Sequence, residues 1–174
     1  MRTLLLLFGL LPFATSAGAQ TFKIAHETFH PALTNLSSAG YIKEYLPAGQ
    51  TSADWTKSFG VSVLKKAVPP RSYISNLCKS YHRQYPEMKY ASGGQESRNR
   101  WFADFLVYPK TPASKYLEWN FFRAQTNSAG GIIVFQYTER RTFKKSIQEL
   151  DSWDVPALRK QLLPFLMTNE FVIK

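Results

Sequence analysis

The two histidines of the HETFH stretch are four residues apart, which is the spacing of the His-Glu-x-x-His motif of zinc hydrolases. In that motif a helix directs His26 and His30 to one zinc ion, and Glu27 acts as the general base. Helical spacing leaves about 6 Å between the two Cβ atoms, whereas four residues of strand separate them by about 13 Å. A zinc-dependent hydrolase is therefore an alternative function that requires residues 26–30 to be helical.

The residues around HETFH favour a strand. Pro31 follows His30 directly, and a proline disfavours the α conformation of the residue before it. Residues 22–29 include β-branched side chains and lack the apolar stripe of a helix. Leu33 stands where the longer form of the motif has a glycine, and the one remaining histidine is the distant His82. We therefore expect no metal ion and no other cofactor.

Cys78 and His82 are a second candidate pair, because residues four apart on a helix can touch. A nucleophilic thiol usually lies at a helix N-terminus, which lowers its pKa. Cys78 instead falls in the middle of an apolar stripe formed with Ile74, Leu77 and Tyr81. We expect a buried core thiol beside a half-exposed histidine. As the only cysteine, Cys78 also excludes an intramolecular disulfide, which favours a bacterial periplasm.

No complete catalytic set is visible elsewhere. Asp104 and Glu118 could face each other across two neighbouring strands, although exposed strand positions explain both. The chain has no Gly-x-Ser-x-Gly motif. The glycine pairs in residues 92–95 and 128–131 are typical of hairpin turns rather than of phosphate-binding loops. These observations favour a protein that is not an enzyme.

Two groups of basic residues are candidate binding sites for an acidic protein or an anionic envelope component. They are Arg140, Arg141, Lys144 and Lys145, and Arg98, Arg100 and Trp101. The formal net charge of +10 agrees with acidic partners. Nucleic acid is not expected, since binding it needs aromatic side chains ordered along a basic groove.

The first 19 residues have the three parts of a secretory signal peptide. Arg2 supplies the positive charge, an apolar run extends from Leu4 to Phe13, and small residues end at Ala19, where we expect cleavage. The apolar run is shorter than the roughly 20 residues of a membrane-spanning helix. The sequence thus predicts a periplasmic or secreted protein with no transmembrane segment after cleavage, formed by one domain over residues 20–174.

Hydrophobic periodicity predicts an α+β domain in which two or three helices cover a mainly antiparallel sheet of about six strands. The expected strands are residues 21–29, 41–46, 58–66, 100–108, 116–125 and 131–139. The expected helices are residues 69–86, 143–150 and 157–166. Alternation in 116–125 places Leu117, Trp119 and Phe121 on one side, and Glu118, Asn120 and Phe122 on the other.

The order of strands, helix, strands and helices resembles that of small exported domains of the PsbP/Mog1-like kind. The stretch YLPAGQTSADW, residues 45–55, also resembles a phrase of uncharacterised secreted bacterial proteins. Neither resemblance implies an activity. The function expected from the sequence is therefore that of an exported, non-enzymatic binding, accessory or inhibitor/immunity-type protein. A binder of anionic envelope components is the second alternative.

Overall fold

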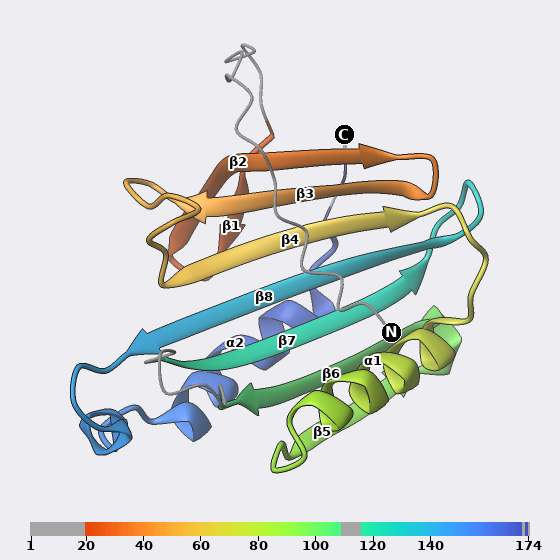
Figure 1. The fold of residues 1–174 in the computed structure, drawn as a ribbon. Helices are drawn as coiled ribbons and strands as arrows, with labels where there is room; N and C mark the ends of the chain where they lie inside the picture. Colours follow the sequence, from red (N-terminus) through yellow and green to blue (C-terminus); the bar gives the residue numbers. More distant parts are fainter. Residues whose placement is uncertain (1–19, 109–115, 172, 174) are drawn as a thin grey trace.

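The computed structural model describes residues 20–108, 116–171 and 173, which form one antiparallel sheet of eight strands with two α-helices (Figure 1). The strands are β1 (Phe22–Ile24), β2 (Glu27–Ser37), β3 (Gly40–Pro47), β4 (Lys57–Leu64), β5 (Tyr90–Gln95), β6 (Arg100–Val107), β7 (Tyr116–Thr126) and β8 (Ile132–Thr142). The helices are α1 (Pro70–Gln84) and α2 (Val155–Thr168), with short 3₁₀ turns η1 (Glu96–Arg98) and η2 (Ile147–Leu150). The sheet order β1-β2-β3-β4-β8-β7-β6-β5 joins two four-stranded meanders at the β4–β8 pair.

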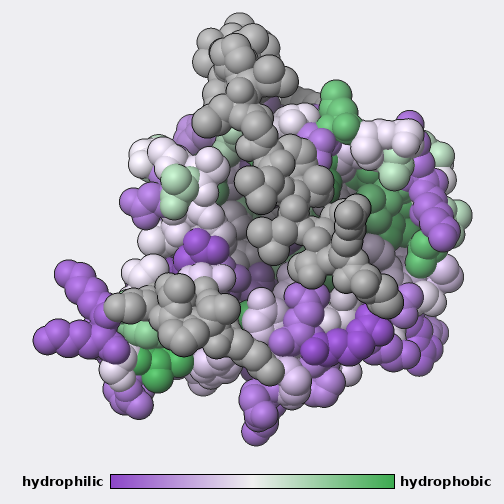
Figure 2. Space-filling model, viewed as in Figure 1, coloured by the Kyte–Doolittle hydropathy of each residue, from purple (hydrophilic) through white to green (hydrophobic). Residues whose placement is uncertain are grey.

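The two helices cover opposite faces of the sheet, here called the α1 face and the α2 face (Figure 1). Ile74 and Cys78 of α1 pack against β6 and β7, and the outward side of this helix is largely hydrophilic (Figure 2). In β7, Trp119 and Phe121 join the core on the α2 face, and Phe122 joins the core on the α1 face. This confirms the alternation predicted for residues 116–125.

The sheet curls toward the α2 face. The ring centroids of Phe22 in β1 and Phe59 in β4 lie 4.9 Å apart. In a flat sheet these strands, three positions apart, would be separated by about 14 Å. Phe171, beyond α2, fills the curl with its ring 5.0 Å from those of Phe59 and Phe135. An aromatic core thus occupies the α2 face of the sheet.

The α+β class is confirmed, but eight strands replace the expected six. The segment expected as one strand at 21–29 is divided by a turn at Ala25 and His26, and β2 continues past Pro31 to Ser37. The register shifts between Pro31 and Leu33, so the proline lies at a bulge, where its missing N–H is tolerated.

Strand β5 occupies residues that the sequence predicted to be a turn. Two glycines let this edge strand lie against the aromatic side chains of β6. A Cβ atom at Gly94 would lie only 2.5 Å from the Trp101 ring. The glycines therefore serve close packing here rather than a hairpin.

Helices α1 and α2 confirm the predictions for residues 69–86 and 157–166. The prediction of a helix at residues 143–150 is wrong, because only the 3₁₀ turn η2 forms there. The Glu149 carboxylate accepts hydrogen bonds from the backbone N–H groups of Lys144, Lys145 and Ser146, which lower its pKa. Ser146 and Glu149 form a capping box at the start of η2. The loop before Ser146 therefore does not continue into a helix. Among the described residues, neither helix has the length and apolar character needed to cross a membrane.

Candidate functional site

A cavity of about 340 Å³ lies on the α1 face, and we call it the α1-side cavity. Strands β2, β3, β4, β7 and β8 line it together with Tyr81 of α1. Alternation in β4 turns Phe59 and Val61 into the core of the α2 face and leaves Ser58 and Gly60 toward the cavity. These small side chains leave space for a ligand.

The polar floor of the cavity is a chain of three side chains on β8 and β7. Gln136 Nε2 donates to Thr138 Oγ1 at 3.1 Å, and that hydroxyl donates to Asn120 Oδ1 at 2.9 Å. Asn120 is only 2% exposed, and its Nδ2 group has no hydrogen-bond partner among the described residues. A buried donor left without an acceptor costs about 1–3 kcal/mol. Asn120 Nδ2 is therefore a polar group of the floor that the described residues leave unsatisfied.

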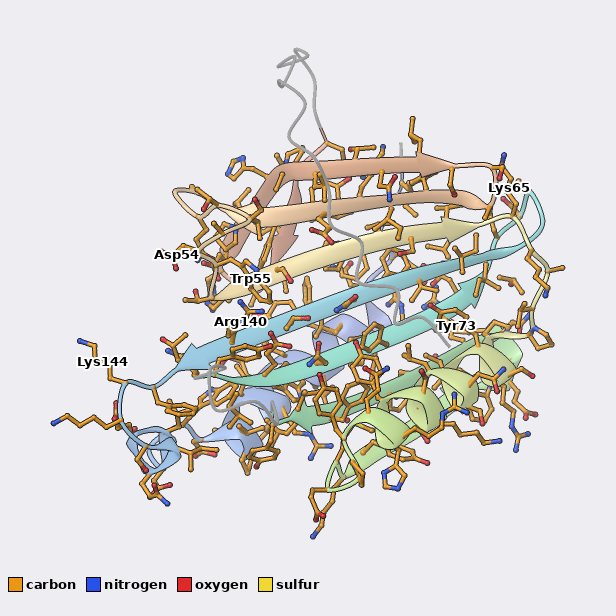
Figure 3. The ribbon with its side chains drawn as sticks, viewed as in Figure 1. Asp54, Trp55, Lys65, Tyr73, Arg140 and Lys144 are labelled. Carbon is orange, nitrogen blue, oxygen red and sulfur yellow. The ribbon has the colours of Figure 1, made fainter. Side chains whose placement is uncertain are left out.

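Arg140 forms one wall, near the end of β8. Its Nε and Nη2 atoms donate to Glu118 Oε1 at 2.8 and 2.6 Å. Its guanidinium carbon lies 3.8 Å from the centroid of the Trp55 ring and 4.4 Å from that of Tyr116. Figure 3 shows Trp55 and Arg140 close together where β4 begins and β8 ends. The ion pair neutralises both charges, and the stacking holds the two rings at the cavity wall.

The loop that carries Trp55 is fixed by Gln50. The Oε1 atom of Gln50 accepts hydrogen bonds from the backbone N–H groups of Thr56 and Lys57 at 2.7 and 3.3 Å. The sequence singled out this segment through the resemblance of residues 45–55, without a role. Its position shows that Trp55 is a wall of the α1-side cavity.

Glu44 and Tyr81 complete the lining with shifted pKa values. The walls of the cavity desolvate the Glu44 carboxyl and raise its pKa, although the side chain remains open to the cavity. Burial, then the charge of Glu118 and the neighbouring Tyr85 and Tyr73, raise the pKa of Tyr81 to about 12. Glu44 forms no ion pair with any described residue, so the cavity has a slight excess of negative charge.

The raised pKa of Tyr81 predicts a contribution to alkaline unfolding. The folded value of about 12 exceeds the unfolded value near 10. This contribution to stability is therefore fully present below pH 10 and is lost as the pH rises toward 12. We expect Tyr81→Phe to raise the midpoint of alkaline unfolding, measured by circular dichroism with tyrosinate absorbance. The exposed Tyr90→Phe serves as the control, and equal midpoints for both variants would contradict the assignment.

The fold does not bring the first basic group, residues 140–145, together as one surface. Arg140 lines the cavity, whereas the adjacent Arg141 points to the other face of β8 and donates to Glu139 Oε1 at 2.9 Å. Lys144 and Lys145 lie in the loop between β8 and η2, and Lys144 projects from that loop (Figure 3). The partner predicted for this group, an acidic protein or anionic envelope component, stays a prediction.

The second basic group is divided in the same way. Arg98 lies in η1, and Arg100 forms an ion pair with Glu170. Trp101 points to the α1 face, where the guanidinium carbon of Arg71 lies 4.9 Å from its ring centroid. Alternation along β6 thus separates Arg100 from Trp101.

HETFH does not have the geometry of a zinc site. His26 lies in the turn after β1, His30 lies in β2 opposite Leu46, and both are exposed. Glu27 is bound by Lys57 Nζ at 2.6 Å instead of facing a metal ion. Within residues 20–108 and 116–171, no three His, Cys, Asp or Glu side chains gather closely enough to hold a metal. The helical arrangement that the zinc hydrolase alternative requires is absent.

The members of the other candidate pairs differ in burial or in the face of the sheet on which they lie. Cys78 is buried, which raises the pKa of its thiol, and His82 is exposed, so the prediction of a core thiol is confirmed. Asp104 and Glu118 do not face each other, and the interpretation of both as exposed strand positions is wrong. Asp104 is buried on the α2 face against Arg159, whereas Glu118 lines the cavity on the α1 face.

Sequence reasoning missed the cavity floor. Alternation placed Asn120 on the same side as Phe122, a polar side chain beside a core aromatic one, and this was the available signal. Gln136 and Thr138 lie on the neighbouring strand, where only the β7–β8 register shows that they are adjacent to Phe122 and Asn120.

A protein-family model matches residues 18–163, a range that includes every strand of the sheet and all described residues of the cavity lining. The chain belongs to this family. No curated protein and no solved structure matches it. The PsbP/Mog1-like resemblance in element order stays a prediction.

Proposed function

We propose that this chain is an exported, non-enzymatic binding protein that holds a small polar ligand in the α1-side cavity. The observation that carries the proposal is the Asn120 amide, which is buried and has an unpartnered Nδ2 donor at the cavity floor. The signal-peptide pattern of residues 1–19 supports export to the periplasm or the medium.

The lining has the composition of a small-molecule site. Such sites enclose about 300–1,000 Å³ and combine aromatic surface with a few placed polar groups. The cavity has a volume within this range, aromatic side chains in Trp55, Tyr81 and Tyr116, and the hydrogen-bonded floor that ends at Asn120. Elsewhere on the central strands the buried side chains are mainly apolar.

The described lining residues support binding rather than catalysis. Glu118 is held by Arg140, which leaves Glu44 as the carboxylate available to a ligand. Ser52 and Ser58 are hydroxyl groups in the lining, but no histidine lies there to act as their base. A nucleophile with an adjacent base is therefore missing from the described part of the cavity.

A valine at Gly60 provides a test of the site. A Cβ atom at Gly60 would lie 3.6 Å from Gln136 Cβ, an ordinary contact, and the rest of the side chain would fill the cavity. Valine also suits a strand better than glycine, so we expect folding stability to be equal or higher by up to about 1 kcal/mol.

The measurement is a screen of uncharged polar fragments by amide NMR on the mature chain, residues 20–174. We expect fragments to shift the side-chain amide signals of Asn120 and Gln136, and to lose this effect in Gly60→Val. Ser62→Val, on the same strand and face but outside the cavity lining, should behave as the wild type. Fragments that leave both amides unmoved, or that bind Gly60→Val equally, would overturn the proposal.

A further inference from the structure

The hydrogen-bonding groups of the α1-side cavity restrict the chemistry of its ligand. We infer that the ligand is a neutral carbohydrate of at least two sugar units, an inference that rests on the proposed function. Three observations carry it: the charge of the lining, the kinds of hydrogen bond it leaves unmade, and their separation across the sheet.

The charge of the lining disfavours an anion. Arg140 is the cation of the described lining, and its guanidinium is already engaged by Glu118 through two hydrogen bonds. Glu44 remains without an ion-pair partner among the described residues. An anionic ligand would meet an uncompensated carboxylate, although the chain as a whole is basic.

The unmade hydrogen bonds disfavour a simple cation. Asn120 Nδ2 is a buried donor without an acceptor, whereas the exposed Glu44 carboxylate accepts hydrogen bonds from the ligand groups that replace its water. An ammonium group could satisfy Glu44 but has no acceptor to offer Asn120. A neutral hydroxyl both donates and accepts, so a polyhydroxylated ligand satisfies both ends of the cavity.

The register of the sheet sets the length of the ligand. Glu44 lies opposite Gly60, which lies opposite Gln136, and Asn120 is on the strand beyond, in the adjacent row. Three strand spacings separate the two backbones by about 14 Å across the sheet. Because side chains on strands stand roughly perpendicular to the sheet, most of this distance remains between the Glu44 and Asn120 side chains. A single sugar ring is too short to reach both groups, whereas two or more linked rings can.

Aromatic side chains provide the remaining contact that a sugar requires. Trp55 and Tyr116 line the cavity and are each only partly buried. Their rings are held by Arg140 and by the loop that Gln50 fixes. The C–H face of a pyranose packs on such rings, which present apolar surface beside the polar floor.

The test is a glycan array that carries neutral, sialylated and sulfated glycans, probed with the labelled mature chain. We expect binding to neutral glycans of two or more units. Asn120→Asp should weaken it at least tenfold, because a carboxylate accepts from Thr138 as the amide does but cannot donate to the ligand. Asn76→Asp makes the same charge change at an exposed position of α1 and should bind normally.

The outcomes separate this inference from the proposed function. Binding only to sialylated or sulfated glycans, or equal binding by Asn120→Asp and wild type, would overturn the carbohydrate assignment. Gly60→Val provides a second variant if Asn120→Asp folds poorly in a thermal melt. An array without binding would also overturn it, and the fragment screen would then show whether the cavity still binds another class of molecule or whether both proposals fail.

Discussion

Replacing Arg123 by methionine is expected to lower the free energy of unfolding by about 2–3 kcal/mol. Arg123 is 1% exposed, and its Nη1 atom lies 2.7 Å from the carbonyl oxygen of Leu166, 3.2 Å from that of Met167 and 2.8 Å from that of Asn169. These carbonyls end helix α2, where they have no partner within the helix. Methionine would leave them buried without a donor.

Contacts of Arg123 with two aromatic rings add to the effect, while burial disfavours its charge. Its guanidinium carbon lies 4.7 Å from the centroid of the Phe135 ring and 5.1 Å from that of Phe171, so one side chain joins β7, β8 and the end of the chain. Burial, then the charge of Arg100, lower the pKa of Arg123 to about 10. The group is protonated in both folded and unfolded states at neutral pH, so the loss should be the same at pH 6 and pH 8.

Urea unfolding of the mature chain measures this loss. Arg123→Lys keeps the charge but not the planar donor group, and we expect an intermediate stability. Arg83→Met, at an exposed position of α1, is the control for removing an arginine. A loss below about 1 kcal/mol for Arg123→Met would show that Arg123 does not fasten α2.

Replacing Arg159 by methionine is expected to cost about 2–3 kcal/mol. Arg159 binds the Asp104 carboxylate through Nε at 2.6 Å and Nη2 at 3.1 Å, and Asp104 is 3% exposed. Removing one partner of a buried ion pair typically costs 3–5 kcal/mol. The lower figure applies here because the Arg159 side chain is 39% exposed, so solvent already screens part of the attraction.

A double-mutant cycle with Asp104→Asn distinguishes the ion pair from packing. Asparagine removes the buried charge and can still accept the hydrogen bond that Trp119 Nε1 donates to Asp104 at 3.1 Å. We therefore expect Asp104→Asn to restore part of the stability lost in Arg159→Met. Lys160→Met, on the exposed side of α2, is the control. Additive losses in the double variant would contradict a coupling between Asp104 and Arg159.

Both predictions concern the face of the sheet opposite the α1-side cavity. Arg123 and Arg159 fasten α2 and the residues after it to the α2 face, where the curl of the sheet gathers the aromatic core. Their loss should therefore reduce stability without changing the ligand preference of the molecules that remain folded.

The local pattern of apolar and polar residues was sufficient to predict several helices and strands of the fold. The apolar stripe through Cys78 predicted α1, and alternation in residues 116–125 predicted which side chains of β7 enter each core. These features depend on propensity and on burial of one face, which neighbouring residues encode.

The predictions were wrong where the local conformation depends on contacts with a strand that is distant along the chain. Pro31 is tolerated within β2 because the pairing with β3 is shifted there, and the glycines of β5 form a strand because the rings of β6 occupy their side-chain space. The basic residues around Arg140 are a cluster in sequence only, since alternation and the ion pair with Glu118 disperse them. No local pattern contains these contacts.

The sequence by itself determined the α+β class, the buried thiol of Cys78, the positions of helices α1 and α2, and the two faces of β7. The sequence also favoured a strand over a zinc-binding helix at residues 26–30, and the tertiary structure added the turn at Ala25 and His26 that divides β1 from β2. The tertiary structure alone decided that Asn120, Thr138 and Gln136 meet at the floor of a cavity. The physical reason is register: cross-strand pairing brings together residues that are distant along the chain, and it depends on the whole sheet.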